Sequence, residues 1–128
     1  MSAMSDYLEN EILDHILGTG AYTMPTTVYV GLSTASFNDD NSGTELTGNN
    51  YAREAAAFTA AASGTTANSA AVEFNAATGS WGTVSHFGIF DALSGGNLLI
   101  HGAFTTPKLI GNGDILKIPT GDLDITAA

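Results

Sequence analysis

The first periodic segment of the chain is residues 6–17, where leucine and isoleucine recur every three or four positions. This spacing places the apolar side chains in one stripe along a helix. Ser5 stands before the segment as a predicted N-cap, and Gly18 follows it as a residue that can end a helix in the left-handed conformation. We therefore predict one amphipathic helix over residues 6–17, packed against the rest of the chain or against a neighbouring protomer.

The chain after this helix, residues 26–126, has the pattern of short strands. Residues 26–34 alternate apolar and polar side chains, which is the period of a half-buried strand. Ser94-Gly95-Gly96-Asn97 separates two apolar runs and predicts a tight hairpin. Further strands are predicted over residues 51–62, 72–74, 84–91, 98–105, 108–110, 115–118 and 123–126. The pattern predicts a mainly β fold, an antiparallel sandwich or a small barrel, with one N-terminal helix.

Length and composition limit the classes of protein that fit this pattern. The 128 residues correspond to about one domain, so we expect residues 1–128 to form a single unit. Three basic and 13 acidic side chains give a formal net charge of −10. Nucleic acid and anionic membranes bind proteins mainly through Lys and Arg, so neither is an expected partner. The segment before the helix has neither a basic region nor an apolar run, so we expect no secretory signal.

The chain has no cysteine, which excludes disulfides, thiol nucleophiles and Cys-ligated metals. The histidines offer another route to a metal site, because His86 and His101 lie on the two arms of the predicted hairpin, with Asp91 nearby in sequence. They lack a recognisable ligand spacing, and two hydrogen-bonded histidines in a sheet are the favoured interpretation. We expect no metal and no cofactor.

Other site motifs are absent or incomplete. No Gly-x-Ser-x-Gly elbow presents a nucleophile, and no glycine loop ends in Gly-Lys to hold a phosphate. Asn38, Asp40 and Ser42 match early positions of a calcium loop, but Asn49 stands where the bidentate Glu belongs. The sequence therefore predicts no enzyme and favours a solvated loop over a calcium site.

One basic residue is a candidate for binding a partner. Arg53 follows Tyr51 closely in a strongly acidic chain, and an arginine beside a tyrosine is typical of an interface anchor. Internal pairing with Glu54, Glu45 or a sheet neighbour is the alternative. Tyr7 and Glu11 on the helix complete the set of interface candidates.

Five blocks carry a resemblance over nearly the whole chain, and the block from Trp81 to Asp91 is the most specific. The blocks are Tyr7-Leu8-Glu9-Asn10 with Leu13-x-His15, Pro25-x-x-Val28-Tyr29-Val30-Gly31-Leu32-x-Thr34, Gly43-Thr44-Glu45-Leu46-x-Gly48-x-x-Tyr51-Ala52-Arg53, Trp81-Gly82-x-Val84-x-His86-Phe87-Gly88-Ile89-Phe90-Asp91, and Ser94-Gly95-Gly96-Asn97-Leu98-Leu99 with Gly113-Asp114-x-Leu116. Together they are similar to small bacteriophage virion structural proteins, which are often described as tail fibre proteins. The resemblance implies a virion component without catalytic residues.

The resemblance leaves the place on the particle open. A compact chain of 128 residues has no room for a long fibre shaft, so we interpret it as a capsid cement or decoration protein. The alternative is a tail-associated fibre, adaptor or tip protein, which would bind a receptor or carbohydrate through Trp81 and exposed tyrosines. The expected partners are the major capsid protein or tail proteins, together with further copies of the chain. The expected location is the virion, assembled in the cytoplasm of the host.

Overall fold

The computed structural model describes residues 2–127 and consists mainly of antiparallel β-sheets with one helix near the N-terminus. The helix is α1 (Asp6–Ile16), which directly follows the short strand β1 (Ser2–Met4). The other strands are β2 (Val28–Ser33), β3 (Glu54–Ala56), β4 (Thr65–Ala67), β5 (Val72–Glu73), β6 (Gly82–Phe90), β7 (Leu98–Ile110), β8 (Lys117–Ile118) and β9 (Asp124–Thr126). The predicted fold class is confirmed, and the sheets do not close into a barrel.

The largest sheet has five strands in the order β1-β7-β6-β2-β3, and every neighbouring pair is antiparallel. Its centre is the hairpin of β6 and β7, which was predicted from the turn at residues 94–97. Gly95 and Gly96 have φ angles of +64° and +70°, a backbone conformation that residues with a Cβ rarely adopt. The Asp91 carboxylate accepts hydrogen bonds from the Asn97 backbone N–H at 2.7 Å and its side-chain amide at 3.0 Å. The turn is therefore closed by its own side chains.

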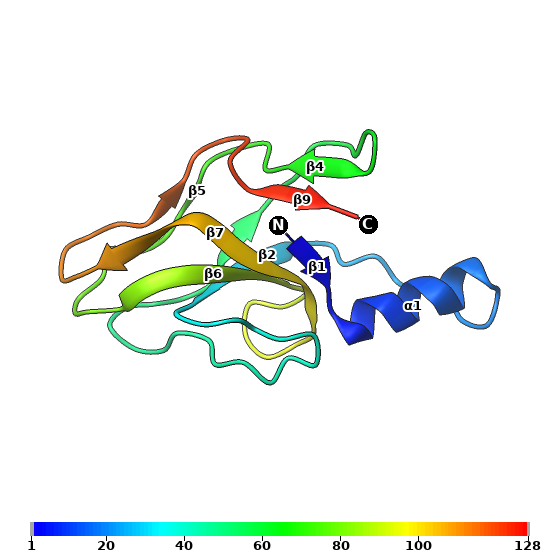
Figure 1. The fold of residues 1–128 in the computed structure, drawn as a ribbon, viewed down its shortest axis with the longest axis horizontal. Helices are drawn as coiled ribbons and strands as arrows, with labels where there is room; N and C mark the ends of the chain where they lie inside the picture. The colour runs from blue at the N-terminus through cyan, green and yellow to red at the C-terminus, as the bar shows by residue number, and fades with distance from the viewer. Residues whose placement is uncertain (1, 128) are drawn as a thin grey trace.

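Two small sheets, β4 with β9 and β5 with β8, contribute to the same core as the large sheet (Figure 1). The buried core residues from these elements and their connections are Val30, Leu32, Val72, Phe74, Ala77, Trp81, Val84, Phe87, Ile89, Ile110, Leu116, Ile118, Leu123 and Ile125. A second, smaller cluster joins Phe37 of the long loop before β3 to Phe90 and Leu98. Since Phe90 follows Ile89 along β6, the large sheet buries side chains on both of its faces.

Three elements differ from the sequence prediction. The strand β1 was not predicted, because three residues are too few to show a period; it forms as an edge partner of β7. The strand β7 continues past Thr105 to Ile110 and includes Pro107, which stands at a register shift between β6 and β7 where the ladder is interrupted. Of the strands predicted over residues 108–110 and 115–118, the first is the end of β7 and the second is reduced to β8, which pairs with β5.

The Ala-rich segment 51–62 is extended and not helical, as predicted, although only Glu54–Ala56 forms a regular strand.

The two described ends of the chain lie together. The Ser2 hydroxyl accepts a hydrogen bond from the Thr126 backbone N–H at 2.9 Å. Because both ends are held at one place, α1 leaves the body of the molecule from a fixed point (Figure 1).

Candidate interaction surface

The first turn of α1 is firmly attached to the large sheet. Ser5 is the N-cap that the sequence predicted, and its side-chain oxygen accepts a hydrogen bond from the Leu8 N–H at 3.2 Å. The same hydroxyl donates to the Leu98 carbonyl, while the Ser5 backbone N–H donates to the Leu99 carbonyl at 2.8 Å. Leu8 is the one helix residue that is fully buried. The base of the helix is thus held by both backbone hydrogen bonds and packing.

The second half of α1 has no such attachment. Leu13 is 55% exposed, Ile16 is 70% exposed, and Leu17, the C-cap residue, is 71% exposed. Met24 in the connection that follows is 79% exposed. Figure 1 shows α1 extending away from the sheets, so this part of the apolar stripe has no part of its own chain to cover it. We call Leu13, Ile16 and Leu17 the helix end.

The helix end is closed by hydrogen bonds despite its exposure. The Leu17 N–H donates to the Leu13 carbonyl at 2.9 Å, and the Asp14 carbonyl accepts from the backbone N–H groups of Thr19 and Gly20 at 2.9 and 3.1 Å. The Nδ1 atom of His15 accepts from the Tyr22 backbone N–H at 3.2 Å. The returning connection therefore closes the last turn and presents the apolar side chains in one defined arrangement.

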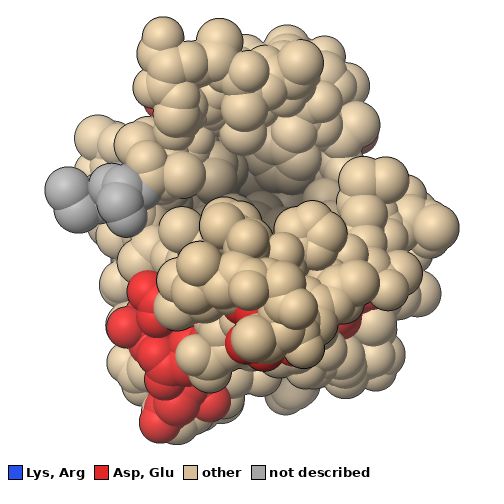
Figure 2. Space-filling model, turned by 90° about the vertical axis from the view of Figure 1, so that its right-hand side faces the viewer, with Lys and Arg blue, Asp and Glu red and all other residues tan. Residues whose placement is uncertain are grey.

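Charge is unevenly distributed around this surface. Figure 2 looks at the molecule from the side toward which α1 extends: most of that face is free of charged groups, acidic side chains gather mainly at one lower edge, and no Lys or Arg is visible. The helix itself carries acidic residues in its first turn and no Lys or Arg. A binding partner would therefore need an apolar surface to cover the helix end and a charge that is compatible with the nearby carboxylates.

Arg53, the sequence-predicted interface anchor, lies inside the molecule. Its guanidinium forms a two-point pair with the Glu45 carboxylate, with N–O distances of 2.9 and 2.8 Å. The same group donates to the carbonyls of Ala92 and Gly95 at 2.8 Å each, and it lies 3.6 Å from the centre of the Phe90 ring. The internal pairing that the sequence left open is the arrangement found here, so Arg53 joins the 45–53 segment to the β6–β7 turn.

Tyr51 belongs to the same cluster. Its hydroxyl donates to the Glu45 carboxylate and accepts from the Leu32 backbone N–H at 2.9 Å. Its ring stacks on Phe74 and meets Trp81 edge-on. Burial is the main cause that raises the pKa of Tyr51, and the Glu45 carboxylate adds to it.

Tyr7 and Glu11 lie half-buried on α1, before the helix end. Burial raises the pKa of Tyr7, and the nearby carboxylates of Glu11 and Asp91 raise it further. An interface role for Tyr7, Glu11, Tyr51 and Arg53 stays a prediction. The sequence left open whether the apolar stripe of the helix packs on its own chain or on a neighbouring protomer, because the pattern is the same in both cases; Leu13, Ile16 and Leu17 were not among the interface candidates.

The histidines do not face one another as the hairpin suggested. His86 pairs in register with Ala103, and His101 pairs with Gly88. The His101 Nε2 atom lies 2.7 Å from an Asp39 carboxylate oxygen, while His86 Nδ1 lies 2.7 Å from the Ser85 hydroxyl. Among residues 2–127 there is no group of three His, Asp or Glu side chains placed to hold a metal ion.

The acidic loop at residues 38–42 is closed by its own hydrogen bonds. The Asn38 amide donates to the Ser42 hydroxyl at 3.0 Å, and the Ser42 backbone N–H donates to the Asp40 carboxylate at 3.0 Å. The positive φ angles of Asn38 and Asn41 are typical of asparagine in tight turns. This geometry is that of a turn rich in polar side chains.

Trp81 is also internal. It is 5% exposed, and its indole N–H donates to the Asn49 carbonyl at 3.0 Å. A ring that is buried on all sides offers no face on which a sugar could stack. Trp81 therefore does not supply the sugar-stacking face that the tail-associated alternative gave it, and a carbohydrate role of the exposed tyrosines stays a prediction.

The fold and its surface define a small β-rich structural module with one projecting helix. The family described as podophage GP4 fiber I protein gp80 matches residues 3–126, and the chain belongs to this family. The resemblance to phage virion structural proteins is thereby confirmed, and the chain is a phage tail fibre protein and a component of the virion. Membership favours the tail-associated alternative over the capsid cement interpretation.

A comparison with curated protein sequences found no match to the chain. Within the described residues, no helix has the length and apolarity that crossing a membrane requires.

Proposed function

We propose that this chain acts as one rigid, non-enzymatic unit of the tail fibre, which it joins by burying the helix end against another protein of the virion. The observation that carries the proposal is the contrast within α1: the first turn is anchored by Ser5 and Leu8, whereas Leu13, Ile16 and Leu17 are largely exposed. Large apolar side chains clustered on a projecting helix are typical of a surface that another protein covers.

The rest of the molecule supports a role in assembly. The interface candidates Arg53 and Tyr51 and the sugar-stacking candidate Trp81 all make contacts inside the molecule. The family is one of fibre proteins, so contacts with other virion proteins follow from membership. A fibre does not require every component to form its shaft, and a compact module can serve as a joint between longer components. This removes the objection that the chain is too short for a fibre.

The experiment is incorporation into particles. A phage that lacks this gene is complemented with the wild-type chain, with Leu17→Asp, or with Asn112→Asp, which adds the same charge at an exposed turn far along the chain. Purified particles are then analysed for the protein and for tail fibres. We expect Leu17→Asp to be lost from particles and Asn112→Asp to be retained. Normal incorporation of soluble, folded Leu17→Asp would refute the proposed role of the helix end.

A further inference from the structure

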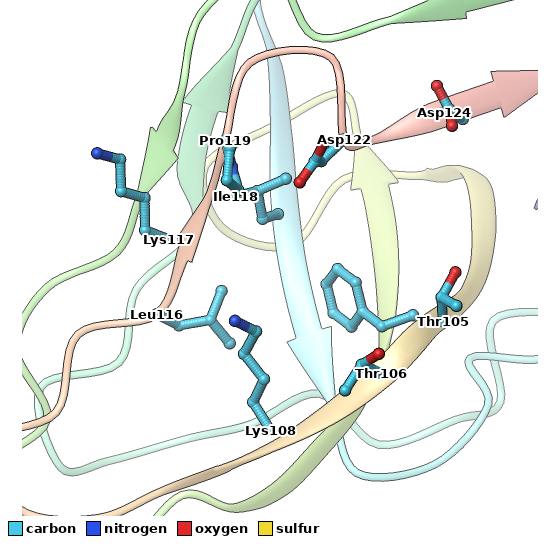
Figure 3. A pocket seen from close by; sticks show the side chains of 10 residues that line it. Thr105, Thr106, Lys108, Leu116, Lys117, Ile118, Pro119, Asp122 and Asp124 are labelled. Carbon is cyan, nitrogen blue, oxygen red and sulfur yellow. The ribbon is translucent and has the colours of Figure 1, made fainter.

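A groove in the described surface lies between β7 and the segment that carries β8 and leads into β9. It has a volume of about 450 Å³. Its buried or half-buried apolar lining comes from Phe104, Leu116 and Ile118. Figure 3 shows Thr105 and Thr106 on the β7 side, facing the segment that carries Leu116, Ile118 and Pro119. The groove thus combines an apolar floor with open sides.

The groove also carries two of the basic residues of the protein. The chain has three basic residues, and Arg53 is buried against Glu45. The other two, Lys108 and Lys117, are exposed and both line this groove. In Figure 3 the Lys108 amine lies beside Leu116 at one end of the groove, and Asp122 and Asp124 lie toward the other end. The Lys117 side chain extends from the opposite side of its segment, at the rim of the groove. In a protein with a net charge of −10, the Lys108 end of this groove is where a nearby carboxylate would find a positive side chain.

The helix end has the complementary properties. Its side chains are apolar, and the exposed carboxylates of Glu9 and Asp14 lie on the same helix. Two helix ends brought together would place these carboxylates side by side with no Lys or Arg on α1 to offset them. A helix end placed at the Lys108 end of the groove instead meets apolar side chains and a lysine, away from Asp122 and Asp124. Charge therefore favours pairing of helix end with groove over pairing of helix with helix.

The pairing joins two copies, because α1 extends away from the strands that form the groove of its own copy (Figure 1). We propose that the helix end of one copy seats in the Lys108–Lys117 groove of a second copy of this chain. This inference rests on the proposed function and names the partner of the helix end. Such a contact is heterologous, so each copy still presents one free groove and one free helix end. Repetition then produces a ring or a linear row of copies.

The absence of cysteine makes this geometry directly testable in the full-length protein. Three single-cysteine variants are made at exposed positions: Leu17→Cys on the helix end, Thr106→Cys in the groove, and Asn112→Cys as a control outside it. Variants are mixed in pairs under mild oxidation, and disulfide-linked dimers are followed with time. We expect Leu17→Cys to crosslink rapidly with Thr106→Cys. We expect this rapid crosslinking to be lost when Asn112→Cys replaces Thr106→Cys. Adding Lys108→Glu to the Thr106→Cys variant should also abolish the rapid crosslinking.

Two results would overturn the inference. Leu17→Cys that crosslinks with itself as fast as with Thr106→Cys would show that helix ends pair with one another. Crosslinking of Leu17→Cys with Thr106→Cys at no more than the control rate would show that the groove does not receive the helix end. If Leu17→Asp were nevertheless lost from particles, the proposed function would stand, and the protein that covers the helix end would be a different virion protein.

Discussion

Replacing Arg53 with alanine tests whether this residue acts inside the fold. The Arg53 side chain is 8% exposed and its partner Glu45 is 22% exposed, so the substitution leaves a mostly buried carboxylate without its counter-charge. Breaking a buried ion pair on one side costs about 3–5 kcal/mol, and loss of the stacking on Phe90 adds about 0.5–2 kcal/mol. Because Glu45 can recover some contact with water, we expect a total loss of about 3–5 kcal/mol in the free energy of unfolding.

The assay is urea unfolding of the isolated protein, followed by tryptophan fluorescence, since Trp81 lies in the core. Lys117→Ala is the matched control: it removes a cation that is exposed, and its effect should stay within about 0.5 kcal/mol. A double-mutant cycle of Arg53→Ala with Glu45→Ala should show strong coupling, because both changes remove the same pair. A loss below about 1 kcal/mol for Arg53→Ala would refute the reasoning, since it would mean that the pair contributes little to folding.

Three further predictions concern stability. Phe87→Ala removes a ring that is buried in the main core and should lower the free energy of unfolding by about 3–5 kcal/mol; a change below about 0.5 kcal/mol would contradict its core position. Ser5→Ala removes the N-cap of α1 and its bond to Leu98, and should cost about 1–2 kcal/mol in chemical unfolding, whereas an unchanged midpoint would show that the cap is dispensable. The pKa of Tyr51 is raised above its ordinary value of 10.0. The contribution of Tyr51 to the free energy of unfolding is therefore complete below pH 10.0, and it is lost as the pH rises above 10.0 toward the raised pKa. Unfolding measured on both sides of pH 10.0 should show this loss for the wild type and a smaller one for Tyr51→Phe, and equal losses would place the titrating group elsewhere.

Local signals account for the elements that the sequence predicted well. Ser5 and the acidic first turn determine where α1 begins, and Gly95 with Gly96 supplies the left-handed conformations that the β6–β7 turn requires. These features depend on residues a few positions apart, so they can be recognised without knowing the rest of the fold. The strand β1 and the pairing of β5 with β8 depend on partners far along the chain, and no local pattern records them.

The candidate site likewise combines features that the local sequence reveals with features that depend on distant parts of the chain. The sequence indicated that Arg53 would form a specific contact, but whether the partner was Glu45 or another protein depended on how two loops come together. The apolar stripe of α1 was also visible, yet periodicity does not reveal that the stripe is covered at Leu8 and bare at Leu17. The groove escaped prediction because Lys108 and Lys117 come from strands that belong to different sheets.

The central claim is that the helix end is covered by protein in the assembled particle. Reaction of Leu17→Cys with a maleimide reagent measures this directly, with Asn112→Cys as a position that stays exposed in the isolated chain. Labelled peptides of this chain are quantified by mass spectrometry in the isolated protein and in intact virions. The account predicts that Leu17→Cys is labelled in the isolated protein and protected in the virion, while Asn112→Cys is labelled in both. Equal labelling of Leu17→Cys in the two states would contradict the account.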